Sequence, residues 1–383
     1  SVGCSTLAVI DENPQYSVFA LTAHKNARLL FEQCQKYTPV FAVIGVDAAA
    51  EFEVLVKESD LATKRLVGKS ALVEVASSPD VDIVMAAIVG AAGLESTLAA
   101  ASNGKRLLLA NKESLVMTGD LLKQAATQSG AEILPIDSEH NAIFQCLPIT
   151  GSSLQATDYK GIEKVVLTAS GGPFLNTPLE QLASVTPEQA CLHPKWSMGR
   201  KISVDSATMM NKGLELIEAF HLFPVSGDNI EIVVHPQSVI HSMVAYVDGS
   251  VLAQLGSPDM RTPIAYALVW PERMVAPVPR LDFSVVTSLT FEQPDMIRFP
   301  ALRLAREALN AGGGAPTVLN AANEVGVAHF LKSRIGFLDI SSIVEETMQR
   351  IGDSRPDSIE SIIELDATAR RVAEAHAAER VAA

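Results

Sequence analysis

The first part of the chain alternates short apolar runs with stretches of helical period. Strand-like runs occur at 17–22, 40–44, 65–67, 82–88, 106–110 and 132–136, and helix-like segments at 4–10, 25–36, 48–57, 94–103 and 113–129. This alternation is typical of a parallel, doubly wound sheet. We therefore predict an α/β, Rossmann-like domain over residues 1–136. Because no strand precedes the first helix, we expect its first strand to be missing and the sequence to be incomplete at its start.

The pattern changes after residue 136. Strand-like runs at 165–168 and 230–234, and a predicted hairpin at 238–245 and 250–254, indicate a mixed sheet in a second α/β domain, 137–268. Prolines without periodicity predict a linker at 269–295. Helix-like segments at 300–310, 317–333, 340–349 and 358–380 predict a C-terminal helical bundle over 296–383.

Polar side chains share one face of a helix predicted at 203–215. At roughly 100° per residue, Thr208, Asn211, Lys212 and Glu215 lie in one sector, while the apolar residues at 209, 210, 214, 217 and 220 face the other way. Such a face suits an anion and a cation bound side by side. We expect the polar positions 203, 205 and 206 at the start of this helix, where free N–H groups bind oxyanions. The alternative is a surface helix with an i,i+3 Lys212–Glu215 pair.

Charge and composition restrict the class of protein. The formal net charge is −14, and no block of Lys or Arg interrupts the acidity, which argues against a nucleic-acid or membrane-surface partner. The 48% hydrophobic fraction contains no apolar run of about 18 residues, so no membrane span is predicted. Cys4, Cys34, Cys146 and Cys191 have no C-x-x-C spacing. We therefore expect reduced thiols and a cytoplasmic protein.

Three carboxylates suggest a metal site. Asp137 and Glu139 follow a predicted strand at i,i+2, and Glu215 lies on the polar helical face. Carboxylate oxygens are the ligands that Mg²⁺ and Mn²⁺ prefer. The alternative is that Asp137 and Glu139 cap a helix at 140–145. Separately, Lys25 follows the second-strand position of a dinucleotide fold, where a basic residue favours NADP over NAD.

At these residues the sequence resembles the 1-deoxy-D-xylulose-5-phosphate reductoisomerase family over nearly its full length. Five segments carry most of the resemblance: LANKESLV (109–116), PIDSEHNAIF (135–144), SGGPF (170–174), HPKWSMG (193–199) and VDSATMMNKGLE (204–215). Three more extend it: HPQSVIHSM (235–243), PDMRTP (258–263) and LNAANE (319–324). The family's glycine-rich phosphate-binding turn is represented only by its end, at residues 1–3.

The resemblance implies an NADPH-dependent enzyme of the non-mevalonate isoprenoid precursor pathway. It would convert 1-deoxy-D-xylulose 5-phosphate to 2-C-methyl-D-erythritol 4-phosphate with one Mg²⁺ or Mn²⁺ ion per site. The expected partner is therefore a phosphorylated sugar, with no nucleic acid and no membrane. We expect a homodimer in a bacterial-type cytoplasm, and the expected incomplete start leaves a plastid origin open.

The resemblance also implies roles for individual residues. The metal ligands are Asp137, Glu139 and Glu215. The catalytic residues are Lys112, Glu139 and His193. The substrate contacts, including the phosphate anchors, are Lys112, Ser138, Glu139, Ser170, His193, Ser206, Asn211, Lys212 and Glu215. The cofactor contacts are Ser1, Val2, Lys25, Asn26, Asn111, Glu113 and Gly199. The flap residues are Trp196 and Met198.

Some alternatives stay open at this point. A catalytically silent NADP-binding protein would have lost part of this constellation, and an NADP dehydrogenase of another small phosphorylated substrate would not need three carboxylates opposite a phosphate site. Trp196 is either part of a mobile cover or a fixed hydrophobic plug. Metal dependence distinguishes the reductoisomerase from a simple dehydrogenase.

Overall fold

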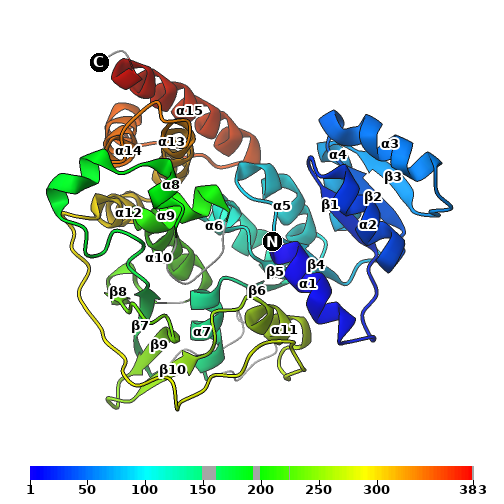
Figure 1. Cartoon of the computed structure of the whole chain (residues 1–383), viewed down its shortest axis with the longest axis horizontal. Helices are drawn as coiled ribbons and strands as arrows, with labels where there is room; N and C mark the ends of the chain where they lie inside the picture. The colour runs from blue at the N-terminus through cyan, green and yellow to red at the C-terminus, as the bar shows by residue number, and fades with distance from the viewer. Residues whose placement is uncertain (149–160, 193–198, 224, 382–383) are drawn as a thin grey trace.

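The computed structural model describes residues 1–148, 161–192, 199–223 and 225–381 (Figure 1). Two three-stranded parallel sheets form its first part. They comprise β1 (Ala20–Ala23), β2 (Phe41–Ile44) and β3 (Lys64–Val67), and β4 (Ile83–Ala86), β5 (Arg106–Leu109) and β6 (Glu132–Pro135). The predicted doubly wound sheet thus occurs as two halves, and among the described residues no strand joins β1 to β4. The first half forms a separate lobe on the right of Figure 1.

Helices alternate with these strands, as the sequence pattern predicted. They are α1 (Val2–Asp11), α2 (Ala27–Tyr37), α3 (Ala49–Lys57), α4 (Lys69–Ser77), α5 (Leu94–Ser102) and α6 (Lys112–Ser129), with short 3₁₀ turns η1 (Val46–Ala48) and η2 (Ala91–Gly93). Helix α4 was not predicted, because its apolar residues at 71–73, 75 and 76 form a nearly continuous run without a clear helical period. Strands β4, β5 and β6 are in parallel register, so the segments that follow them leave the same edge of the sheet.

The second sheet is mixed, as predicted. Its order is β10-β9-β7-β8, with β7 (Ile162–Ala169) parallel to β8 (Ile230–Val234) and antiparallel to β9 (Ile240–Tyr246). The hairpin of β9 and β10 (Val251–Leu255) turns at Gly249, whose φ of +86° is readily adopted by glycine. The surrounding helices are α7 (Ser138–Cys146), α8 (Pro187–Ala190), α9 (Arg200–Ala207), α10 (Met210–Leu222) and α11 (Arg261–Val269), with 3₁₀ segments η4 (Leu179–Ser184) and η5 (Gly227–Asn229).

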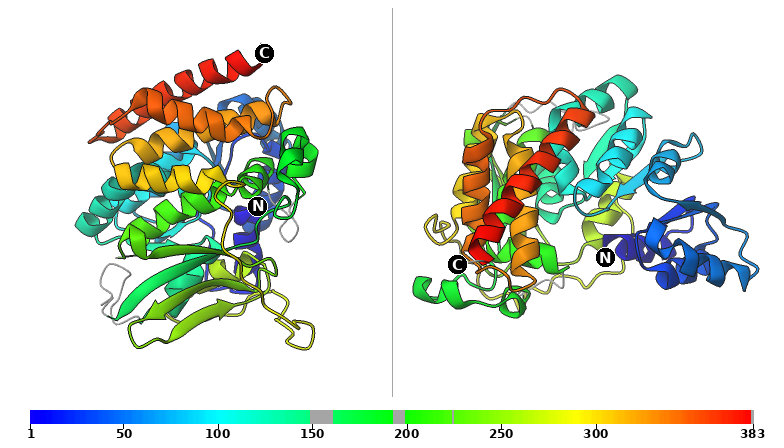
Figure 2. Two further views of the ribbon diagram at one scale, coloured as in Figure 1. Left: turned by 90° about the vertical axis from the view of Figure 1, so that its left-hand side faces the viewer. Right: turned by 90° about the horizontal axis from the view of Figure 1, so that it is seen from above.

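Four helices end the chain: α12 (Pro300–Ala311), α13 (Ala315–Phe330), α14 (Asp339–Ile351) and α15 (Ile359–Val381). Figure 2 shows them stacked on one side of α10, with the mixed sheet on the other side. One continuous apolar core contains Leu167 of β7, Ile217 of α10, Leu304 of α12 and Phe330 of α13. The C-terminal helices therefore support the helix that carries the polar face. Within the described residues no helix is long and apolar enough to cross a membrane.

The prediction of a single helix at 203–215 is wrong, because two helices occupy this stretch. Met209, at φ +59°, lies between α9 and α10 and changes the direction of the chain. Ser203, Asp205 and Ser206 therefore lie inside α9 rather than at a helix start, and Thr208 ends α9. The side chain of Met209 is buried in an apolar cluster, so packing holds a backbone conformation that non-glycine residues rarely adopt. Asn211, Lys212 and Glu215 still share a helix, α10.

Candidate active site

Two adjacent parallel strands deliver functional side chains to one edge of the sheet. Leu109 of β5 pairs with Pro135 of β6, and the chain then enters α6 at Lys112 and α7 at Ser138. Asp137 is the N-cap of α7, so the capping alternative is correct for this residue. It does not exclude a second role, because only one of its oxygens accepts the capping hydrogen bond from Ser138 N.

The three predicted carboxylates meet at this edge. Asp137, Glu139 and Glu215 each place one oxygen within 4.8 Å of the oxygens of the other two. Glu215 is fully buried and reaches the cluster from α10. The donor set fits a hard divalent cation, because all three ligands are carboxylate oxygens.

Two lysines lie among these carboxylates. Lys112 Nζ is 2.8 Å from Asp137 Oδ2 and 2.6 Å from Asn211 Oδ1. Lys212 Nζ is 2.9 Å from Glu139 Oε1 and also contacts Glu215. The Lys212–Glu215 pair thus exists, but both residues are buried, so the alternative of a surface helix is wrong.

The electrostatics keep both lysines charged. Burial alone would lower the pKa of Lys112, but the nearby carboxylates, Asp137 foremost, outweigh it and raise that pKa well above its ordinary value. The pKa of Lys212 is also raised, because Glu139 and Glu215 outweigh burial. Burial, assisted by the charge of Glu139, raises the pKa of Glu215 to about 8. The cluster therefore offers permanent cations and one carboxyl group that takes up a proton near neutral pH.

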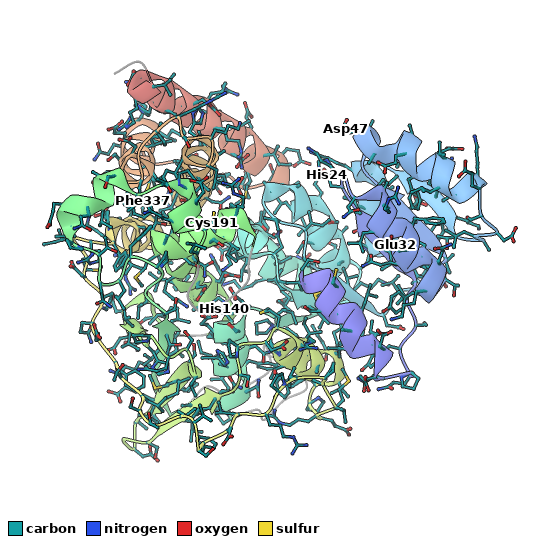
Figure 3. The ribbon with its side chains drawn as sticks, viewed as in Figure 1. His24, Glu32, Asp47, His140, Cys191 and Phe337 are labelled. Carbon is teal, nitrogen blue, oxygen red and sulfur yellow. The ribbon has the colours of Figure 1, made fainter. Side chains whose placement is uncertain are left out.

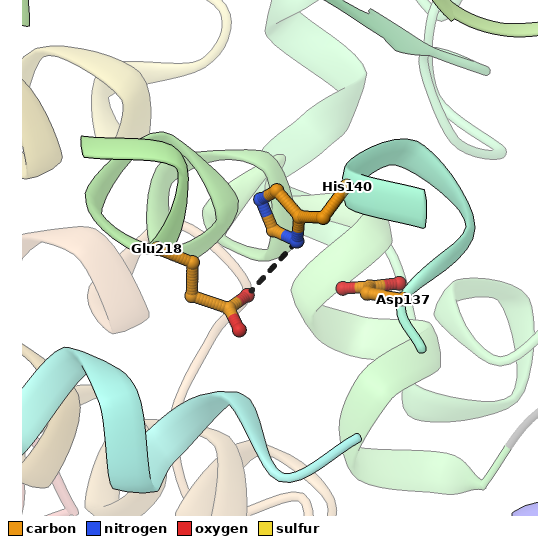
Figure 4. A group of neighbouring side chains, drawn as sticks. All are labelled: Asp137, His140 and Glu218. Carbon is orange, nitrogen blue, oxygen red and sulfur yellow. Dashed lines mark ion pairs between the residues drawn. The ribbon is translucent and has the colours of Figure 1, made fainter. Parts of the chain in front are cut away.

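A second group of buried ionisable side chains, His140 and Glu218, adjoins the carboxylate cluster. His140 Nδ1 lies 3.8 Å from Glu218 Oε2, and Asp137 is their neighbour (Figure 4). His140 Nε2 lies 2.9 Å from the backbone carbonyl oxygen of Glu215. Burial raises the pKa of Glu218 well above its usual range and lowers that of His140. His140 lies near the centre of the molecule in Figure 3.

The remaining predicted substrate contacts come from four segments: Ser138 begins α7, and the phosphate anchors Ser170, Ser206 and Asn211 belong to the loop after β7, α9 and α10. Ser138 donates to Glu139 across 2.6 Å, and Asn211 contacts both Lys112 and Glu215. The loop after β7 packs tightly on the end of α9: a Cβ on Gly172 would lie 2.6 Å from the carbonyl oxygen of Ser206. This close approach brings the segment of Ser170 against that of Ser206.

The predicted cofactor residues lie at both half-sheets and at the start of α1. Ser1 caps α1, which begins at Val2 and packs against α11 and the main core. Asn26 caps α2 directly after Lys25 on the separate lobe. His24, the neighbour of Lys25, is labelled on that lobe in Figure 3, away from His140. On the other half, Asn111 donates to the carbonyl oxygens of Ile88 and Gly90, which fixes the glycine-containing turn after β4.

Glu113 and Gly199 complete the predicted cofactor set. Glu113 is buried, and its carboxylate lies 2.9 Å from Lys201 Nζ, which is also 2.9 Å from Asp205. The charge of Lys201 outweighs burial and lowers the pKa of Glu113. Gly199 is the N-cap of α9. The predicted residues His193, Trp196 and Met198 lie outside the described residues.

Sequence reasoning missed two groups at the site. Glu218 is one helical turn beyond Glu215, so the same spacing argument would have placed it on the same face. His140 belongs to the motif PIDSEHNAIF (135–144), but no role was predicted for it. The side-chain amide of Asn323 on α13 donates a 2.8 Å hydrogen bond to Asp205. Because the two residues are far apart in sequence, no local periodicity could have predicted this hydrogen bond.

Comparisons with known proteins agree along nearly the whole chain. Residues 1–119 match the family model described as 1-deoxy-D-xylulose 5-phosphate reductoisomerase. Residues 133–223 match the model of that enzyme's C-terminal domain, and residues 255–372 match a model described as DXP reductoisomerase C-terminal domain.

Similar proteins carry the same name. The chain is 57% identical to the 1-deoxy-D-xylulose 5-phosphate reductoisomerase of Pseudomonas paraeruginosa, covering 97% of this chain and 94% of that protein. It is 55% identical to that of Acinetobacter baumannii, covering 98% and 95%.

Two solved structures are also similar. A DOX-P reductoisomerase in complex with NADPH, fosmidomycin and magnesium superposes with a TM-score of 0.95 at 48% identity, covering 99% of this chain and 96% of that one. The Zymomonas mobilis enzyme in complex with NADPH has a TM-score of 0.90 at 49% identity, covering 98% and 96%.

Proposed function

The chain belongs to the 1-deoxy-D-xylulose 5-phosphate reductoisomerase family, and we propose that Asp137, Glu139 and Glu215 hold the divalent metal of its active site. The protein is an NADP-dependent oxidoreductase that converts 1-deoxy-D-xylulose 5-phosphate to 2-C-methyl-D-erythritol 4-phosphate, with NADPH and a divalent metal. The observation that carries the site assignment is the convergence of three carboxylate oxygens within 4.8 Å, between two lysines.

Charge arithmetic supports an anionic substrate at this site. Three ionised carboxylates and two ammonium groups carry a formal charge of −1, or 0 when Glu215 holds a proton, and one divalent cation makes the site positive in either case. A phosphorylated sugar then meets a net positive site, although the whole chain is strongly acidic. When bound, the metal supplies Lewis-acid stabilisation of negative charge on substrate oxygens, and NADPH supplies hydride.

The residues of the chain orient the substrate and hold protons. The Lys112 ammonium stays charged, pairs with Asp137 and donates a hydrogen bond to Asn211. It therefore stabilises negative charge rather than acting as a base. Ser138 and Asn211 offer a hydroxyl and an amide at the same edge. Lys212, with Ser170, Ser206 and Asn211, would bind the phosphate group, and this binding away from the reacting carbons supplies positioning.

For the cofactor, we propose contacts from both half-sheets. Lys25 and Asn26 would lie on the separate lobe, Asn111, Glu113 and Gly199 on the other side, and Ser1 and Val2 at the start of α1, which packs against the main core. The fixed turn that follows β4 supports this arrangement, because Asn111 holds its carbonyl groups in place. His193 would act in catalysis, and Trp196 and Met198 would cover the substrate, as the family resemblance implies.

An assay of NADPH oxidation tests the function. We expect oxidation only when 1-deoxy-D-xylulose 5-phosphate and Mg²⁺ or Mn²⁺ are both present, with 2-C-methyl-D-erythritol 4-phosphate identified by mass spectrometry. Oxidation that persists after chelation of the metal would favour a simple dehydrogenase. NADPH binding without turnover would favour a silent binding protein.

The remaining expectations extend this proposal. We propose domains at 1–136, 137–268 and 296–383 with a linker at 269–295, a cytoplasmic location, and a homodimer. The homodimer is supported by β10, an edge strand of the mixed sheet whose Val251 and Leu252 are 56% and 50% exposed. Light scattering of the purified protein measures the number of copies, and a monomer would contradict the homodimer.

A further inference from the structure

The metal-ligand carboxylates lie on two helices that meet at one buried polar contact. Asp137 and Glu139 belong to the start of α7, and Glu215 belongs to α10. His140 is fully buried on α7, directly after Glu139, and Glu218 is 3% exposed on α10, one turn after Glu215. Figure 4 shows the two side chains pointing toward each other across the gap between the helices, with Asp137 beside them.

The position of the protons on His140 follows from its partners. Its Nε2 lies 2.9 Å from the carbonyl oxygen of Glu215, and a carbonyl only accepts, so Nε2 carries a proton. Its Nδ1 faces Glu218 Oε2 at 3.8 Å, and neither of these two atoms has a hydrogen-bond partner in the described structure.

We propose that Glu218 and His140 form a buried clamp that sets the spacing between α7 and α10, which makes Glu218 a positioning residue for the metal site. The inference rests on the proposed metal ligands. The His140 ring donates a hydrogen bond through Nε2 to the backbone of Glu215, and its Nδ1 faces the carboxyl group of Glu218 at 3.8 Å, so both ring nitrogens are directed at α10. Partners that orient ligands in this way commonly change metal affinity about 10–100-fold when removed.

A cation bound by Asp137, His140 and Glu218 is the competing interpretation. Their ligand atoms also lie within 4.8 Å of one another. However, this group offers two carboxylates and an imidazole, whereas Mg²⁺ and Mn²⁺ prefer an all-oxygen set such as Asp137, Glu139 and Glu215. The positioning role is therefore favoured.

Mn²⁺ binding to the full chain, followed by electron paramagnetic resonance without substrate or NADPH, tests the clamp. We expect Glu218→Leu to raise the Mn²⁺ dissociation constant at least about tenfold. Glu218→Gln should bind nearly as the wild type does, because its amide can donate to His140 Nδ1. The matched control is Ile217→Ala, which creates a cavity next to Glu218 in the same buried helix. It should lower Tm and leave Mn²⁺ affinity unchanged.

The clamp is overturned if Glu218→Leu binds Mn²⁺ as tightly as the wild type, or if Ile217→Ala weakens binding equally. A second Mn²⁺ per wild-type chain that Glu218→Leu removes would instead identify Glu218 as a ligand. Failure of the wild type to bind Mn²⁺, or binding unaffected by Glu215→Gln, would overturn the proposed metal site itself. If Glu218→Leu does not fold, ¹⁵N NMR of wild-type His140 decides: an unprotonated Nε2 would refute the clamp.

Discussion

Lys212 Nζ lies 2.9 Å from Glu139 Oε1, so a proposed phosphate anchor on α10 is paired with a proposed metal ligand on α7. Lys212 also contacts Glu215 on its own helix. The same ammonium therefore pairs with two of the three ligand carboxylates. Lys212 therefore connects the proposed phosphate and metal sites. Its removal should affect binding of the substrate and binding of the metal ion differently.

We expect Lys212→Ala to weaken binding of the phosphorylated substrate without weakening binding of the metal. Loss of a charge-assisted hydrogen bond costs about 1.5–3 kcal/mol, which corresponds to a rise in KM of roughly 10–150-fold. Mn²⁺ binding without substrate should be unchanged or tighter, because a competing positive charge is gone. Steady-state kinetics and Mn²⁺ titration measure the two effects, with the exposed Lys164→Ala as control. An unchanged KM would remove Lys212 from the phosphate site.

Glu215→Gln should nearly abolish turnover and leave the protein folded. Burial raises the pKa of Glu215 to about 8, so the fold already accommodates a neutral side chain at this position. The metal, in contrast, loses a charged ligand, and kcat should fall by more than the roughly 10–100-fold typical of a change outside the ligand shell. Kinetics and thermal unfolding test both statements. Near-normal activity in excess Mn²⁺ would show that Glu215 is not a ligand.

The free energy of unfolding should fall in mild acid, because His221 is buried with a lowered pKa. Burial lowers its pKa to about 4, whereas the unfolded chain has a His pKa near 6.5. Between these values the unfolded state binds more protons, so the free energy of unfolding falls as pH decreases, by up to about 3 kcal/mol. His221→Gln should flatten this dependence in urea unfolding measured from pH 7 to pH 4. An equally steep dependence in the variant would contradict the assignment.

Gly213→Ala should destabilise the contact between the site helix and the C-terminal helices. A Cβ at Gly213 would lie 2.7 Å from Cβ of Ala305 on α12, and the two backbones would have to separate. Overpacking of this kind costs about 1–3 kcal/mol. In the control Gly326→Ala, also inside a helix, the nearest atoms are 3.4 Å away, so stability should stay nearly constant. Equal Tm values for both variants would contradict close packing at Gly213.

The sequence contained enough information to locate the carboxylate cluster but not to describe its surroundings. Asp137 and Glu139 follow a strand whose neighbour in a parallel sheet leads to Lys112, so strand order alone places them at one edge. The break at Met209 could not be predicted, because a left-handed conformation at a non-glycine residue is imposed by packing. The contact between His140 and Glu218 depends on how α7 meets α10, which no local periodicity records.

The most direct test of the proposed metal site is a crystal of the protein soaked with Mn²⁺ and measured at the manganese absorption edge. Anomalous scattering then locates the ion independently of any activity. We predict one strong peak per chain, bound by oxygens of Asp137, Glu139 and Glu215. A peak elsewhere, or no peak at these three carboxylates while the enzyme is active with Mn²⁺ in solution, would contradict the assignment.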